Sequence, residues 1–214
     1  MEPEALLERV LKTYRGFQTY CDAGLVLMPS SKAPIEFKTY LSKPRSLRFE
    51  FTYWHPCSGK DGPSTTNIVW SNGSRTFFRL VNSMTEESSL ECALASATGI
   101  SDGATLQIIP LIYPECINME HWYKKFANLE LCSEELDGMT FFHLSGEQAG
   151  SGKLELWLSK DDFRIRRIRK HYENRKQKHR CQNSEGRSRP FSIEYRYIET
   201  RIDEEIPDSM FNEA

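Results

Sequence analysis

The sequence predicts a mainly β protein of the α+β class, built around an antiparallel meander. Two hairpin signals in the first third of the chain, at residues 37–53 and 67–78, place short turns between β-prone runs. Between Leu47 and Tyr53 apolar and polar residues alternate strictly, so this strand has one apolar and one polar face. A sheet with one aromatic-rich face must be covered by helices or curl around that face.

The chain opens on an expected helix and continues into strands. Apolar residues recur at helical spacing from Pro3 onward, and Gly16 is a natural stop. Five strands are then expected, at residues 23–28, 35–41, 47–53, 67–71 and 75–81.

An apolar helical insertion interrupts these strands. Residues 89–99 favour a helix that Gly99 ends, with Leu90, Leu94 and Ala97 on one stripe. A less regular apolar stretch follows at residues 106–113. In a mostly β chain, such an insertion is a candidate plug for the concave side of the sheet. Strands are expected to resume at residues 127–136, 139–146, 154–158, 164–172 and 191–198.

Length and composition favour one domain covering residues 1–214, because 214 residues with 39% hydrophobic content can bury one sizeable core. A net charge of -2 gives no global attraction to nucleic acid or to an anionic membrane. No stretch approaches the roughly 20 apolar residues of a membrane span. The sequence starts without a signal-peptide pattern, so we expect a cytoplasmic protein if Met1 is the native start, and a periplasmic or envelope protein if an export signal was removed.

No sequence motif supports an enzyme. The chain lacks a nucleophile elbow, a zinc-protease helix motif and a glycine-rich phosphate loop, so we predict no catalytic residue and no cofactor. The pairs His55 with Cys57 and His179 with Cys181 would suit tetrahedral zinc if their loops met. Both pairs lie in polar stretches typical of unconstrained surface, so we predict no metal site.

Basic residues gather between Arg164 and Arg189. Alternation over residues 164–170 indicates that much of this charge is the solvated face of a strand. The polar stretch 173–190 is expected to be a hairpin loop. The other interpretation is contact with an anionic surface or an acidic partner through Arg175, Lys176, Lys178 and Arg180. Nucleic acid is the least expected partner, because exposed aromatic residues are not interleaved with these charges.

In their order, several pieces of the sequence resemble the LolA/LolB superfamily of lipoprotein-sorting proteins, especially its uncharacterised branch. They are the opening helix ending at Phe17, Lys43-Pro44, the hairpin at residues 69–73, the helix at 90–99, the Asp137-Gly138 turn, residues 156–168 and the ending at 206–211. The resemblance spans nearly the whole chain. It implies a curled antiparallel sheet forming an incomplete barrel, with helices inserted in its concave side over a hydrophobic cavity. It also implies non-covalent carriage or sensing of lipids or acylated proteins in the bacterial envelope.

The candidate site is the inward face of this sheet together with the helix above it. Its expected residues are Leu47, Phe49, Phe51, Tyr53, Leu90, Leu94, Ala97, Leu154, Leu156, Leu158, Phe191, Ile193, Tyr195 and Tyr197. They are either an ordinary core under the helices or the lining of a cavity for an acyl chain. We therefore predict non-enzymatic binding of a lipid, acylated protein or other hydrophobic ligand. The alternative is a sensor or protein-interaction domain with a self-filled core that acts through the basic loop 173–190.

Overall fold

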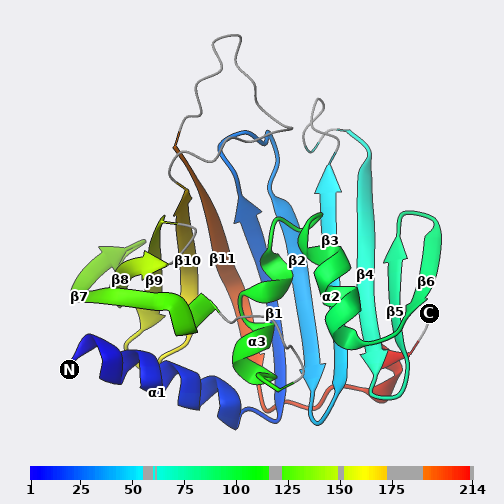
Figure 1. Cartoon of the computed structure of the whole chain (residues 1–214), viewed down its shortest axis with the longest axis horizontal. Helices are drawn as coiled ribbons and strands as arrows, with labels where there is room; N and C mark the ends of the chain where they lie inside the picture. The colour runs from blue at the N-terminus through cyan, green and yellow to red at the C-terminus, as the bar shows by residue number, and fades with distance from the viewer. Residues whose placement is uncertain (55–59, 61, 116–121, 149–151, 173–189, 213–214) are drawn as a thin grey trace.

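One antiparallel sheet dominates the computed structural model, which describes residues 1–54, 60, 62–115, 122–148, 152–172 and 190–212. The sheet has eleven strands in the order β6-β5-β4-β3-β2-β1-β11-β10-β9-β8-β7 and does not close into a barrel (Figure 1). The strands are β1 (Thr19–Leu27), β2 (Ile35–Ser42), β3 (Ser46–Trp54), β4 (Ser64–Asn72), β5 (Thr76–Leu80), β6 (Ser83–Glu87), β7 (Phe126–Leu136), β8 (Met139–Gln148), β9 (Gly152–Ser159), β10 (Ile165–Tyr172) and β11 (Phe191–Ile202). The expected open, curled antiparallel sheet is confirmed.

Helices cover one face of this sheet. The α-helices of the described ranges are α1 (Pro3–Gly16), α2 (Leu90–Thr98) and α3 (Ile109–Ile112), with 3-10 turns η2 (Ala104–Leu106), η3 (Trp122–Lys125) and η4 (Asp208–Phe211). In Figure 1, α2 and α3 lie in front of the central strands, and α1 runs along the lower edge toward β7. Within the described ranges, no helix has the length and apolar content that crossing a membrane requires.

Local sequence explains where the two longer helices begin. Proline in the first turn of α1 and the acidic Glu4 both favour a helix start. For α2, the Ser89 hydroxyl accepts a hydrogen bond from the backbone N–H of Cys92 at 3.1 Å. The buried side of α2 consists of Ala93, Leu94 and Ala97, so its apolar stripe faces the sheet.

The first and last strands meet in the middle of the sheet. β1 pairs with β11 along its length, and the register shifts by one residue at Ala23 and Gly24. A side chain at position 24 would collide with the backbone oxygen of Arg196 and the ring of Phe37. Glycine is therefore required where β1 and β11 approach each other. This pairing joins the N-terminal strands β1–β6 to the C-terminal strands β7–β11.

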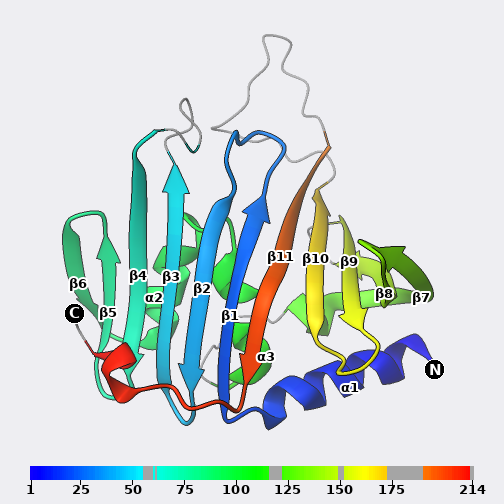
Figure 2. The ribbon, with the colours of Figure 1, turned by 180° about the vertical axis from the view of Figure 1, so that it is seen from behind.

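The C-terminal turn η4 packs on the opposite, outer face, against β3 and β4 (Figure 2). Phe211 is buried there, and Arg48 donates a hydrogen bond to the carbonyl oxygen of Met210. Beside it, the rings of Trp70 and Phe77 stack with centroids 5.1 Å apart. The turn η4 therefore covers part of the outer side of the sheet, over β3 and β4.

Two expectations need correction. The strand β6 was not predicted, because its residues are mostly exposed and polar and show no apolar alternation. The charges of β10 do not all lie on a solvated face: Arg167 and Lys170 are buried. A register shift between Ile165 and Arg167 places two arginines between the inward residues Ile165 and Ile168, and Lys170 follows on the inward side.

Candidate functional site

The concave face gathers the residues predicted from strand alternation. Phe49 and Phe51 of β3, Leu156 of β9 and Tyr195 of β11 are all almost fully buried. Every residue of the predicted set belongs to one hydrophobic cluster or packs against it, with Tyr53, Leu90 and Phe191 only partly buried. Strands from both halves of the sheet thus contribute to one apolar surface.

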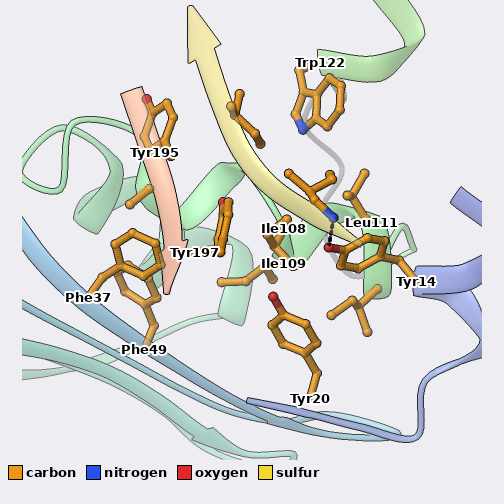
Figure 3. Packing of buried hydrophobic residues seen from close by; sticks show 14 of the residues in the cluster. Tyr14, Tyr20, Phe37, Phe49, Ile108, Ile109, Leu111, Trp122, Tyr195 and Tyr197 are labelled. Atoms are coloured by element: carbon orange, nitrogen blue, oxygen red, sulfur yellow. Dashed lines mark hydrogen bonds between the residues drawn. The ribbon is translucent and has the colours of Figure 1, made fainter. Parts of the chain in front are cut away.

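Aromatic side chains make up much of this surface. Figure 3 shows Phe37 and Phe49 beside each other and Tyr197 projecting from β11 next to Ile108 and Ile109, with Tyr195 farther along the same strand. The ring centroids of Phe37 and Tyr197 are 5.6 Å apart, in an edge-to-face arrangement. The concave face therefore presents aromatic rings to the helices above it.

A few polar contacts attach the covering segments to the sheet and to one another. The Tyr113 hydroxyl, directly after α3, donates to the carbonyl oxygen of Ser42 at 2.8 Å. The Tyr195 hydroxyl donates to the carbonyl oxygen of Asp102 at 2.7 Å. The first bond connects the residue after α3 to β2, and the second connects the segment between α2 and α3 to β11. Trp122 Nε1 also donates to the carbonyl oxygen of Gln107 at 2.9 Å, and apolar packing adds to these bonds.

A cleft of about 470 Å³ lies on the outer face rather than among these residues. None of its lining residues belongs to the predicted inward set. Within the described ranges, the inward residues pack against the protein's own helices. A ligand would therefore have to displace α2 and α3 to reach the concave face.

Asp22 is an unexpected acid on the inward side of β1. Its carboxylate accepts a hydrogen bond from the Tyr20 hydroxyl at 2.8 Å. Burial raises the pKa of Asp22 to about 7, although hydrogen bonds from Thr39 and Tyr20 offset part of that rise. The first residues of β1 were expected to precede the strand, so no pattern in the sequence indicated that Asp22 would face inward.

Lys170 of β10 is a second ionisable group on the inward side of the sheet. It is 8% exposed, and its ammonium group lies 6.0 Å from the ring centroid of Tyr195. Burial lowers the pKa of Lys170 to about 8. The concave face is thus apolar in the middle and carries both Asp22, a buried acid, and Lys170, a buried base.

Other predicted features fall outside the described residues. They are the pairs His55 with Cys57 and His179 with Cys181, and the basic positions Arg175, Lys176, Lys178 and Arg180. Among the described residues, no group of three or more His, Cys, Asp or Glu side chains is arranged to hold a metal ion.

Comparison with solved structures identifies the fold. No protein-family model and no curated protein matches the sequence. A chain of the MucA/MucB complex of Pseudomonas aeruginosa aligns with a TM-score of 0.51 at 10% identity, over 100% of this chain and 62% of that chain. An uncharacterized conserved protein of Thermus thermophilus aligns with a TM-score of 0.50 at 13% identity, over 97% of this chain and 91% of that chain. A LolA superfamily protein of Nitrosomonas europaea is also similar, with a TM-score of 0.35 at 10% identity, over 100% and 98% of the two chains.

At these identities the similarity concerns the fold alone. The chain shares its fold with the Pseudomonas aeruginosa and Thermus thermophilus chains, and its own structure is an open antiparallel sheet with helices on the concave side. This chain spans 62% of the length of the matched chain of the MucA/MucB complex.

Proposed function

We propose that this protein, acting as one domain, binds a lipid, an acylated protein or another hydrophobic ligand between the concave face and the helices α2 and α3, without covalent chemistry. The observation that carries this proposal is an open sheet whose apolar, aromatic face is covered by short helices rather than by closure of the sheet. Such a cover can separate from the sheet without breaking strand pairing. The sequence resemblance supports an envelope location for this activity.

The energetics are compatible with a ligand taking the place of the helices α2 and α3 on the concave face. Ten methylene groups moved from water into the apolar space would contribute about 8 kcal/mol. Opening the cover breaks the Tyr113–Ser42 and Tyr195–Asp102 hydrogen bonds, each worth about 1 kcal/mol. It also separates apolar contacts that the ligand's own chain replaces. Ligand binding therefore competes with a closed state that is held mainly by apolar packing.

The test is a titration with a fluorescent fatty acid. We expect saturable binding by the wild-type protein, and tighter binding by about two- to tenfold for Tyr113→Phe, because this variant loses one bond of the closed state. Tyr40→Phe is the matched control, since Tyr40 is on the same strand as Ser42 but points to the outer side of β2. Its affinity should equal that of the wild type.

A second variant tests the location of the ligand. Ala97 is fully buried on the side of α2 that faces the sheet, so a folded Ala97→Trp protein should bind the probe more weakly because the indole fills the volume that the ligand needs. Absence of saturable binding by the wild-type protein, or unchanged affinity in Tyr113→Phe, would reject the concave-face site.

The second candidate function is a sensor or interaction domain with a self-filled core. The observation that favours it is the packing of the inward residues against α2 and α3. Native mass spectrometry separates the two candidates. Co-purified lipid supports the carrier, and a mass equal to that of the bare chain supports the interaction domain acting through residues 173–190.

A further inference from the structure

The outer face carries a cleft of about 470 Å³, between the β1–β2 connection and the strands β10 and β11. Figure 2 shows this connection beside the upper end of β11. Ser192, Glu194 and Arg196 line the cleft from β11, where they alternate with the inward residues Ile193 and Tyr195. The cleft is therefore on the opposite side of the sheet from the concave-face site and is independent of it.

Positive charge exceeds negative charge on the floor of this cleft. Glu194 is 9% exposed, and one of its oxygens lies 2.6 Å from Nη2 of Arg169. Its other oxygen contacts Nε of Arg196 and lies 3.6 Å from Nε of Arg167. Burial by itself would raise the pKa of Glu194, but the hydrogen bonds from Arg196 and Arg169 bring it below its usual range. The ionised carboxylate of Glu194 is thus shared by three guanidinium groups, of which Arg167 also lies 3.5 Å from Asp137.

The excess charge faces the solvent side of the cleft. The side chains of Arg169 and Arg196 remain 32% and 45% exposed, and each guanidinium has five N–H donors. Glu155 lies 3.8 Å from Arg169 but is closer to His171, at 2.6 Å, and to Lys153, at 3.0 Å. The two exposed arginines therefore retain donors for an anion.

The opposite wall combines a further cation with apolar surface. Lys32 is exposed on the β1–β2 connection, and Met28, Ala33 and Pro34 line the cleft beside it. A planar carboxylate can be satisfied by one guanidinium fork, whereas the diverging oxygens of a phosphate can reach cations on two walls. The apolar residues suit a hydrocarbon group joined to that phosphate.

We propose that this outer cleft binds a phosphate group joined to a short apolar body. The volume lies in the range of small-molecule sites. Such a ligand could be the headgroup region of a glycerophospholipid or a soluble phosphomonoester, and the two sources share the chemistry that the cleft recognises.

The experiment is calorimetric titration at low and high salt with three probes. They are dihexanoyl phosphatidylglycerol below its micelle concentration, hexyl phosphate and glycerol 3-phosphate. We expect saturable binding of the first two, weakened by salt, and binding of glycerol 3-phosphate about tenfold weaker because it lacks the apolar body. The tighter of the first two probes identifies the source of the ligand.

The variants change the charge of the cleft without removing an arginine. Ser192→Asp should weaken binding by about tenfold or more, because it adds a carboxylate to the cationic floor. Lys32→Gln should weaken it by a few fold, because it removes the cation of the opposite wall. Lys38→Gln is the matched control: Lys38 is exposed on the outer side of β2 and does not line the cleft, so its affinity should match that of the wild type.

Three results would overturn the proposal: no saturable binding of either amphiphilic phosphate, equal affinity for glycerol 3-phosphate, or unchanged affinity in both Ser192→Asp and Lys32→Gln. Thermal melting confirms that the variants are folded. Because both substitutions lie on the outer face, they should leave fatty-acid titrations unchanged. Failure of this proposal is therefore distinguishable from failure of the concave-face site.

Discussion

Asp22 places a carboxyl group inside a core made mainly of apolar and aromatic side chains. The rise of its pKa from 3.8 to about 7 means that the folded protein holds the proton more tightly than the unfolded chain does. Between about pH 4 and pH 7 the native state therefore binds more protons than the unfolded state. Over this interval the contribution of Asp22 to the free energy of unfolding falls as the pH rises, by about 4 kcal/mol in total.

Replacing Asp22 with Asn should remove this pH-dependent loss. We expect the free energy of unfolding of Asp22→Asn to be similar to wild type at pH 4 and higher at pH 8, because the amide has no charge to desolvate. Urea unfolding at both pH values measures the difference. Asp161→Asn, at an exposed turn, should keep the wild-type dependence. A wild-type dependence in Asp22→Asn as well would show that Asp22 remains ionised in the fold.

Residue patterns predicted which side of the strands is apolar but did not predict Asp22 and Lys170. Alternation identifies Phe49 and Tyr195 because large apolar residues recur every second position. Asp22 and Lys170 follow the same geometry, yet their residue types favour solvent. Their inward orientation depends on the start of β1 and on the shifted register of β10, which only the three-dimensional pairing shows.

At the level of single elements, β3 allows a direct test of register. Phe49 is 1% exposed on the inward side, whereas Glu50 points outward and pairs with Arg48 at 2.6 Å. We expect Phe49→Asp to prevent folding or to lower the free energy of unfolding by about 4 kcal/mol or more, because it buries an unpaired carboxylate. Glu50→Ala should change it by less than about 1 kcal/mol. Chemical denaturation of both variants provides the measurement, and the reverse order of effects would mean a register displaced by one residue.

The elements themselves were predicted unevenly, for physical reasons. Hydrophobic periodicity indicates α1, β3 and β9, because each has one continuous apolar side. The edge strand β6 has no such side, since it is held by backbone pairing to β5. The turn η4 is too short for a periodic signal, and its position on the outer face depends on contacts with β3 and β4.

At the scale of the whole molecule, the sheet and its cover differ in how they are held. The central strands β2, β1 and β11 are hydrogen-bonded on both sides. The helices α2 and α3 have nine and four residues, and their links to the sheet are apolar packing and a few side-chain hydrogen bonds. The sequence could predict that helices cover the concave side. The inward residues pack against these helices in the described structure. This packing depends on side-chain positions, which the hydrophobic periodicity of the sequence does not specify.

This difference predicts where the molecule opens. In native-state hydrogen exchange, the amides of α2 and α3 should exchange through an opening of lower free energy than those of β1 and β11, because side-chain packing rather than strand pairing holds the helices to the sheet. Tyr113→Phe should lower the opening free energy of α3 by about 1 kcal/mol and leave β11 unchanged. Adding a fatty acid should alter protection in α2 and α3 but leave the pairing of β1 with β11 intact. Equal opening free energies for the helices and the central strands would mean that the cover and the sheet unfold as one unit, and a ligand could then enter only by global unfolding.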